Sequence, residues 1–409
     1  GQRTAMGVIR KALLAVVGMG FLAAAANVAY LQATGTSDAA YQSAIAPPGP
    51  TPEAPGPVES LLTPILARVA HMTSTTFASI PPAPAAMPIP VAVPTPTPAP
   101  AQADAAFAQV EVAWRAWMDR NGIAAGAMAI ALPDGRVISA AQDYAPDQTA
   151  PVASLSKAIT GICLDQILSE QGLPWSTRLA DIATGMSAAG VTPRAWNQHI
   201  TLSGLATHTA GLSPDLTQGD LMGRLHGALG LHRRVASDAL RQEALLGNPG
   251  SHFYSNTNYA VLGVVIEALS GQTYTDACMT RVMEPAGIDD AVIHGRMGSM
   301  SSYAGWEISA ESYARLARYW FRAGRPAIDL PDLRPQAGSY AIGYMISGEG
   351  RDAVISHNGR LCRDRETRDG FGATFVALGH GTAFAATWQD CVPSALYDEL
   401  TREIERLLR

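Results

Sequence analysis

Ser154 and Lys157 are the residues of this chain whose types and spacing most directly suggest chemistry. They lie three residues apart in Pro151-Val-Ala-Ser-Leu-Ser-Lys-Ala-Ile-Thr160, and Lys11 is the only other lysine among 29 lysine and arginine residues. Arginine keeps its proton at working pH, whereas a buried lysine can lose one and act as a base. A lysine at a random position would have a serine three residues before it in roughly one case in ten, so the spacing alone is weak evidence. The pair nevertheless suggests a serine nucleophile with lysine as its proton acceptor.

A helix must hold this pair on one face. The residues from Lys157 to Glu170 are apolar with helical spacing, and Gly172 and Pro174 end the pattern. A serine in the first turn and a lysine three residues later project from the same side, whereas Ser156 points elsewhere. The helix N-terminus and burial would both lower the pKa of the lysine. This is the arrangement of an activated nucleophile.

Further motifs follow in an order that resembles the class C β-lactamase and penicillin-binding-protein group of serine hydrolases. Ser154 to Lys157 matches the first motif of that group, Ser-x-x-Lys. Tyr254-Ser-Asn256 matches the second, Tyr-x-Asn, with Pro-Gly before it and an apolar helix, Tyr259 to Ser270, after it. The segments 205–212 and 306–317 also resemble the family. The resemblance extends over about residues 104–409.

The third motif departs from the β-lactamase pattern. His357-Asn-Gly359 stands where β-lactamases have Lys-Thr-Gly, and Tyr340-Ala-Ile-Gly-Tyr344 precedes it. Family members with histidine here resemble esterases, amidases or D-amino-acid peptidases, because neutral imidazole offers a hydrogen bond rather than a fixed charge. The charged insertion 363–369 is expected either to border the pocket or to decorate a hairpin.

The resemblance implies acyl transfer and a role for each motif residue. Ser154 would attack a carbonyl carbon, and Lys157 and Tyr254 would share its proton and return it to the leaving group. Asn256 would hydrogen-bond Lys157 and the substrate. The backbone N–H groups of Ser154 and Arg360 would form the oxyanion hole. The residues expected to bind substrate are Asn256, His357, Gly359 and Arg360, and His208 is expected to tie a turn through its ring.

The family fold implied is α+β: an antiparallel sheet built from strands at both ends of the domain, flanked by helices, with a helical subdomain between the first and third motifs. The sequence itself predicts a first helix at Phe107 to Asn121. Strands are predicted at 126–132, 136–139, 353–357, 372–379 and 382–391, with a turn at Pro133-Asp-Gly135.

Four cysteines, at positions 163, 278, 362 and 391, permit disulfides in an exported protein. The first and third strands of an antiparallel meander run the same way, so Cys362 and Cys391 fall at the same end. We predict a disulfide between them. Cys163 lies in an apolar helix and is interpreted as an ordinary core residue.

The N-terminal region predicts export or membrane attachment. Residues 1–11 form a cationic flank, and the uncharged run 12–31 suits a transmembrane anchor, with a cleaved signal peptide as the alternative. The positive-inside rule places the N-terminus in the cytoplasm of a bacterial inner membrane and the catalytic domain in the periplasm. The Pro/Ala/Thr-rich stretch 32–103 predicts a stalk. This stalk could also bind a partner in a membrane complex.

Composition and missing motifs exclude other classes. The net charge of −6 gives no basic surface for nucleic acid. The sequence has no His-Glu-x-x-His, Cys-x-x-Cys or Gly-x-Ser-x-Gly motif, so neither zinc, another cofactor nor an α/β-hydrolase is expected. The leading prediction is a peptidase, amidase or esterase acting on a small amide or ester. A true β-lactamase and a docking subunit without activity are the alternatives.

Overall fold

A computed structural model describes residues 100–213, 215–217, 231–241, 247–293, 300–325, 340–364 and 366–409. The predicted cationic flank, the anchor at 12–31 and most of the predicted stalk therefore lie outside the described residues. Among the residues that are described, no helix combines the length and apolar character needed to cross a membrane.

A six-stranded antiparallel sheet forms the centre of this domain, with strand order β2-β1-β8-β7-β6-β5. Its strands come from both ends of the domain, as the family fold implies. They are β1 (Gly126–Ala131), β2 (Val137–Gln142), β5 (Met345–Ser347), β6 (Val354–Asp364), β7 (Asp369–Leu378) and β8 (Ala383–Trp388). A separate two-stranded ladder pairs β3 (Ala150–Pro151) with β4 (Glu307–Ile308).

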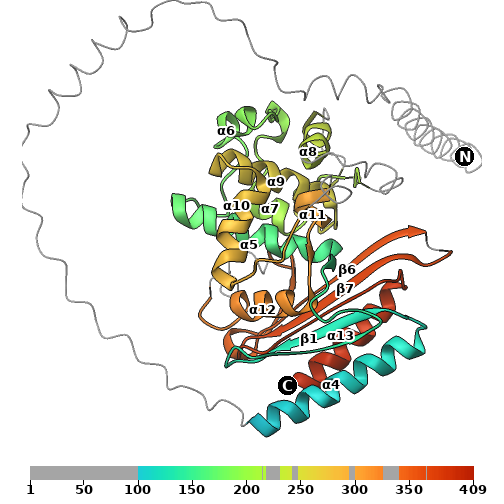
Figure 1. Cartoon of the computed structure of the whole chain (residues 1–409). Helices are drawn as coiled ribbons and strands as arrows, with labels where there is room; N and C mark the ends of the chain where they lie inside the picture. Colours follow the sequence, from blue (N-terminus) through green and yellow to red (C-terminus); the bar gives the residue numbers. More distant parts are fainter. Residues whose placement is uncertain are drawn as a thin grey trace, which may run out of the picture. The chain divides into compact units, whose positions relative to one another are not determined.

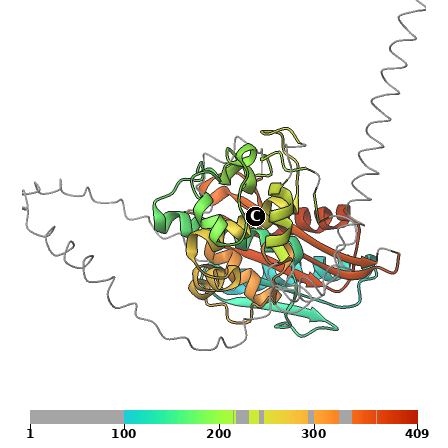
Figure 2. The same cartoon turned by 90° about the horizontal axis from the view of Figure 1, so that it is seen from above.

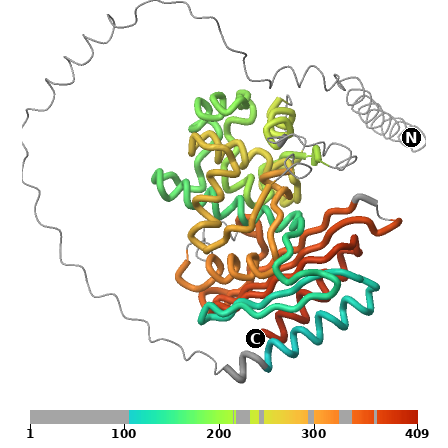
Figure 3. Tube along the Cα trace, viewed as in Figure 1, coloured from blue at the N-terminus to red at the C-terminus, as the bar shows by residue number. Residues whose placement is uncertain are grey.

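The two terminal helices cover one face of the sheet. α4 (Pro100–Arg120) and α13 (Ser394–Leu408) run side by side along it (Figures 1 and 3). Trp114 and Trp117 of α4 and Tyr397 of α13 are buried there against Trp388 of the sheet. Large aromatic side chains bury much apolar area for each residue, which suits them to covering this face of the sheet.

The other face carries the remaining helices, which form the helical layer in Figures 1 and 2. They are α5 (Ser156–Gln171), α6 (Ala183–Ala188), α7 (Leu202–Ala206), α8 (Leu231–Arg241), α9 (Asn256–Ser270), α10 (Tyr274–Cys278), α11 (Ser301–Ala304) and α12 (Ala310–Trp320). Short helical turns lie at Ala153–Leu155 (η1), Ala195–Asn197 (η2), Met279–Met283 (η3), Glu284–Ala286 (η4) and Gly350–Asp352 (η7). Most of the buried apolar side chains lie between this layer and the sheet.

Close approaches at glycines fix α5 against the rest of the site. A Cβ at Gly161 would overlap the carbonyl oxygen of Ile342, and one at Gly343 would overlap that of Lys157. Gly343 also has a φ of +99°, which side-chain-bearing residues rarely adopt. The segment that carries Tyr340 is therefore held directly on the helix that carries Lys157.

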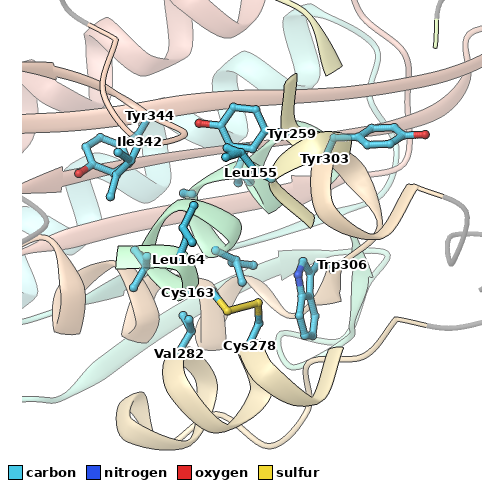
Figure 4. Close-up of a cluster of buried hydrophobic side chains, with 14 of the residues drawn as sticks. Leu155, Cys163, Leu164, Tyr259, Cys278, Val282, Tyr303, Trp306, Ile342 and Tyr344 are labelled. Carbon is cyan, nitrogen blue, oxygen red and sulfur yellow. A yellow bond between two sulfur atoms is a disulfide. The ribbon is translucent and has the colours of Figure 1, made fainter. Parts of the chain in front are cut away.

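Two disulfides are formed. Cys362 and Cys391 are bridged with Cα atoms 5.3 Å apart, which confirms the predicted pair. Cys163 is buried as predicted, but its interpretation as an ordinary core residue is wrong, because it is bridged to Cys278 with Cα atoms 5.2 Å apart. This second bridge joins α5 to α10 inside the apolar cluster that contains Leu164, Val282 and Trp306 (Figure 4). The apolar sequence around Cys163 could not predict this bridge, because a buried cystine and a buried thiol occupy similar surroundings.

Several predicted elements differ in extent. The first helix begins at Pro100 rather than Phe107, and α9 begins at Asn256 rather than Tyr259. The strand predicted to stop at His357 continues to Asp364, so His357 and Gly359 are inside a strand. The described residues of the charged insertion belong to the β6–β7 hairpin, because β6 continues to Asp364 and β7 begins at Asp369. This hairpin extends beyond the helical layer in Figure 2. The hairpin interpretation of this insertion is thus the one the structure favours.

Candidate active site

Ser154 lies in η1, the turn that leads into α5. Ala153, immediately before it, has a φ of +47°, an uncommon conformation for a residue with a side chain. The backbone bends here where β3 passes into the helix, and the bend separates the serine from the regular helix that follows. Ser156 is buried and its hydroxyl accepts the backbone N–H of Trp306 at 3.1 Å. As expected from the spacing, Ser154 rather than Ser156 accompanies Lys157.

Lys157 is completely buried beside this serine. Its Nζ donates to Ser154 Oγ at 3.1 Å and to the carbonyl oxygen of Tyr303 at 3.0 Å. Burial lowers the pKa of Lys157 from 10.5 to about 7, with the negative charge of Asp215 acting in the opposite direction. Near neutral pH, a large fraction of Lys157 is therefore uncharged and able to accept a proton from Ser154.

Tyr254 completes the cluster from the loop before α9. Its hydroxyl is hydrogen-bonded to Ser154 and Tyr340, and its ring lies 4.9 Å from Lys157 Nζ. Although 39% of Tyr254 is exposed, desolvation of the hydroxyl raises its pKa well above the usual value for a phenol. Tyr254 thus remains a neutral phenol, suited to donating a proton or passing one on.

Asn256 has partners that the sequence did not predict. Its Nδ2 donates to Thr217 Oγ1 at 2.8 Å and its backbone N–H donates to Asp215 Oδ2 at 3.1 Å. The expected hydrogen bond from Lys157 to Asn256 Oδ1 is not formed, because Lys157 Nζ donates to Ser154 and to the carbonyl oxygen of Tyr303 instead. Asn256 Oδ1 is buried without a hydrogen-bond partner. This acceptor remains available to a substrate N–H.

The third motif is positioned by strand alternation along β6. His357 is 8% exposed, and Gly359 approaches the nucleophile turn so closely that a Cβ would overlap the carbonyl oxygen of Val152. Successive side chains of a strand point to opposite faces. Accordingly, Asn358 donates to Asp398 of α13 at 3.0 Å, and the charge of Arg360 acts on Tyr397 of the same helix.

The side chain of Arg360 therefore lies on the face of the sheet opposite Ser154. A role for Arg360 in the oxyanion hole can involve only its backbone N–H, as the sequence prediction states. β5 pairs with β6 only from Val354 to Ser356. The edge of β6 that continues through Gly359 and Arg360 is thus not covered by β5, and η1 packs close to it at Gly359.

His357 is held as a neutral ring. Its Nδ1 lies 2.7 Å from the carbonyl oxygen of Asn358, and its Nε2 lies 3.1 Å from Tyr340 Oη. Burial lowers the pKa of His357 to about 3, and the charge of Lys157 contributes in the same direction. Because His357 stays neutral, Lys157 is the described side chain beside Ser154 that can carry a positive charge near neutral pH.

His208 ties the second motif to the α7 loop, as the sequence predicts. Its Nδ1 faces the backbone N–H of Ser255 at 3.2 Å and Asn258 Nδ2 at 3.0 Å. Both partners donate, so the ring proton must be on Nε2. Burial, together with the charge of Lys157, lowers the pKa of His208 well below its usual value. His208 therefore contributes a fixed neutral wall beside Tyr254, 4.4 Å away between ring centroids.

Two contributors were missed from the sequence. Asp215 accepts hydrogen bonds from Thr217 and Asn256, and its charge acts on Lys157. The Asp-x-Thr turn was its only local signal. Tyr340 was noted only as part of the segment before the third motif. Among the described residues, no cluster of three or more His, Cys, Asp or Glu side chains could hold a metal ion.

This geometry supports nucleophilic attack by a serine. A hydroxyl is placed beside a lysine of near-neutral pKa and a phenol of high pKa, and groups whose pKa values are driven apart suit base and acid roles. A cavity of about 380 Å³ between α4 and α13, lined by Trp117, Glu399 and Arg406, is on the opposite face of the sheet. That cavity is therefore separate from the site formed by Ser154, Lys157 and Tyr254.

Comparisons with known proteins agree with the fold. The sequence profile of the family described as Beta-lactamase matches residues 107–386. Penicillin-binding protein 4* of Bacillus subtilis (strain 168) is 32% identical over 154 residues, which cover 36% of this chain and 30% of that protein. The aligned part thus spans about a third of that relative's length.

Solved structures share the architecture at low sequence identity. The octameric penicillin-binding protein homologue from Pyrococcus abyssi has a TM-score of 0.57 at 15% identity, covering 74% of this chain and 77% of that one. A β-lactamase/D-alanine carboxypeptidase from Pseudomonas syringae has a TM-score of 0.56 at 14% identity, covering 74% and 99%. At these identities, the similarity extends to the fold alone.

Proposed function

Because the chain belongs to the β-lactamase family, with the serine hydrolase fold of β-lactamases and D-alanine carboxypeptidases, we propose that it hydrolyses amide or ester bonds through an acyl-enzyme formed on Ser154. The observation that carries this proposal is the 3.1 Å contact between Ser154 Oγ and a Lys157 amine whose pKa is about 7. A lysine that is neutral at working pH can activate a hydroxyl, which an ordinary surface lysine cannot.

Acylation begins with proton transfer from Ser154 Oγ to neutral Lys157 Nζ. The oxygen then bonds to the substrate carbonyl carbon, and the backbone N–H groups of Ser154 and Arg360 receive the developing oxyanion. Asn256 Oδ1, which has no partner of its own, accepts an N–H of the substrate. Each of these roles follows the sequence prediction, apart from the missing Asn256–Lys157 bond.

Collapse of the intermediate requires a proton on the leaving group. Tyr254 is suited to donate it, because its raised pKa keeps the phenol protonated and its hydroxyl contacts Ser154. The proton on Lys157 then replaces the one that Tyr254 gives up. Deacylation follows the same path with water as the nucleophile, and both acid and base return to their starting states.

The substrate class follows from the third motif. In this geometry both nitrogens of His357 are engaged, so the ring presents no fixed cation to a substrate carboxylate. The favoured substrates are small amides or esters, those containing D-amino acids included, rather than β-lactams. A true β-lactamase would need a cation from elsewhere to hold the carboxylate.

The proposed setting is the periplasmic side of a bacterial inner membrane, with residues 12–31 as the anchor and 32–103 as the stalk. The two disulfides support an oxidising compartment, because structural disulfides are rare in the cytosol. Binding of a membrane-complex partner by the stalk is part of the same proposal.

The test compares the parent protein with Ser154→Ala, and with Ser156→Ala as a matched control. We expect a fluorophosphonate probe to add one label to the parent and to Ser156→Ala but none to Ser154→Ala, measured by intact mass. p-Nitrophenyl ester turnover should exceed nitrocefin turnover. Labelling that persists in Ser154→Ala, or a parent that neither labels nor turns over ester, contradicts the proposal.

A further inference from the structure

Tyr340 lies at the junction of the second and third motifs, although neither motif includes it. It is 5% exposed and its ring centroid lies 4.9 Å from that of His208, 5.9 Å from Tyr254 and 5.7 Å from His357. Its hydroxyl is 3.1 Å from His357 Nε2 and is also hydrogen-bonded to Tyr254 and Tyr259. A single hydroxyl thus connects the two motifs.

The proton positions can be deduced from the partners. A backbone carbonyl only accepts, so His357 Nδ1, 2.7 Å from the oxygen of Asn358, carries the ring proton. In a neutral imidazole the other nitrogen is then an acceptor. The Tyr340 hydroxyl must therefore donate to His357 Nε2.

This assignment sets the direction of the next hydrogen bond. Tyr340 has a single hydroxyl proton, and His357 receives it. The hydrogen bond between Tyr340 and Tyr254 consequently requires Tyr254 to donate to Tyr340 Oη. Tyr254 is left with its lone pairs directed at Ser154, so the proton of Ser154 passes to Lys157 in the proposed acylation while the Tyr254 hydroxyl is held in place by Tyr340 and His357.

The backbone makes this position rigid. Gly161 and Gly343 allow the chain at 342–343 to lie directly on α5, two residues beyond Tyr340. Larger residues at either glycine would push this segment away from Lys157. Tyr340 is thus held relative to the helix that carries the base and to the strand that carries His357.

We propose that Tyr340 is a positioning residue of the active site, which fixes the Tyr254 hydroxyl for proton exchange with Ser154 by accepting its hydrogen bond while donating its own to His357. This inference rests on the proposed function. The other groups that face His357 are Lys157 of α5, Tyr254 of the loop before α9 and, through its effect on charge, His208 of the α7 loop. In this role Tyr340 acts through Tyr254 rather than on the substrate.

The first test reads the histidine directly and needs no activity. In protein labelled with ¹⁵N-histidine, we expect His357 to show a protonated Nδ1 and an unprotonated, hydrogen-bonded Nε2 at pH 7. Loss of the signal in His357→Gln assigns it. In Tyr340→Phe, the Nε2 signal should move toward the value of an acceptor without a donor. A His357 that is protonated at Nε2 in the parent overturns the inference.

The second test separates positioning from folding. We expect kcat for a p-nitrophenyl ester to fall about tenfold in Tyr340→Phe, the effect of one lost hydrogen bond to a reacting group, with KM within about threefold. Tyr397→Phe is the matched control, because its buried hydroxyl has no partner and lies on the opposite face of the sheet. An unchanged kcat in Tyr340→Phe overturns the inference. If the parent has no activity, the proposed function fails, and the ¹⁵N measurement still decides the role of Tyr340.

Discussion

Lys157 on α5 and His357 on β6 are two buried bases of one site, and burial affects them with opposite functional results. Desolvation lowers the pKa of both. Lys157 starts from 10.5 and reaches about 7, where it can take and return a proton. His357 starts from 6.5 and reaches about 3, so it remains neutral at physiological pH. In the proposed mechanism, the same physical effect therefore makes lysine an active base and histidine a fixed hydrogen-bond acceptor.

Their neighbours reinforce the difference. The carboxylate of Asp215 favours the charged form of Lys157 and limits the fall in its pKa. The charge of Lys157 disfavours protonation of His357 and deepens the fall there. The comparison shows that the group able to carry a positive charge is Lys157 of the first motif. The third motif contributes the neutral, hydrogen-bonded ring of His357.

The largest contrast is expected from neutral replacements. Lys157→Gln removes the base and should reduce the rate of ester-driven acylation about a thousandfold, the usual range for a lost general base. His357→Gln retains a neutral acceptor for Tyr340 and should change the rate less than about fivefold. Stopped-flow labelling of both variants measures this. Equal losses would break the distinction between the two bases.

Gly359→Ala tests whether the two bases depend on the same close contact. A Cβ there would overlap Val152 O and push β6 away from the turn that carries Ser154. We expect about a hundredfold loss of acylation, as for a small misplacement of catalytic groups. Gly271→Ala is the control: its φ is +67°, and no atom lies within 4 Å of the added Cβ.

The control should lose about 1 kcal/mol of stability, from the left-handed backbone, and keep its acylation rate. Acylation and urea unfolding measured on both variants distinguish a local displacement from general destabilisation. Full acylation in Gly359→Ala would show that strand and turn need not touch.

The pH dependence of stability should separate the bases into two windows. Each has a lower pKa folded than unfolded, so the unfolded chain binds more protons between the two values, and stability rises with pH there. This predicts a rise of up to about 1.4 kcal/mol per pH unit from Lys157 between about 7 and 10.5, and from His357 between about 3 and 6.5.

Urea unfolding at a series of pH values measures these slopes. Lys157→Met should flatten the profile above pH 7, and His357→Gln should flatten it below pH 6.5. If Lys157→Met leaves the slope between pH 7 and 9 unchanged, Lys157 has an ordinary pKa and cannot serve as the proposed base.

The smallest effect is expected at Arg360. Its side chain lies toward α13 and only its backbone N–H is assigned to the site, so Arg360→Ala should change kcat/KM less than about twofold. Steady-state ester hydrolysis tests this. A loss of more than about tenfold would indicate that the guanidinium reaches the substrate and that the site has a second cation.

Sequence reasoning identified what local spacing encodes. The Ser154–Lys157 pair follows from helix geometry, and most strands follow from alternation and turn signals, whereas the antiparallel sheet was implied by the family resemblance. The chemistry of Tyr254 and His357 came from motif order rather than from their surroundings. The Cys362–Cys391 bridge followed from strand direction.

The features that were missed depend on contacts between distant segments. Asp215 reaches the site through a loop without a motif, and Tyr340 gains its role only when α5 and β6 meet. Cys163 was interpreted as an ordinary core residue because its disulfide partner lies 115 residues away in the sequence. The predicted Asn256–Lys157 hydrogen bond was wrong because Lys157 Nζ donates to the carbonyl oxygen of Tyr303, which is distant in the sequence.

The central claim is that Ser154 is activated by a Lys157 that can lose its proton. The most direct test is the rate of fluorophosphonate labelling as a function of pH in the parent and in Lys157→Arg, which keeps the charge but cannot be deprotonated. We predict a parent rate that rises with pH and levels off above about 7, and an arginine variant at least about a hundredfold slower with no such rise. An arginine variant that is labelled at the parent rate would contradict the account.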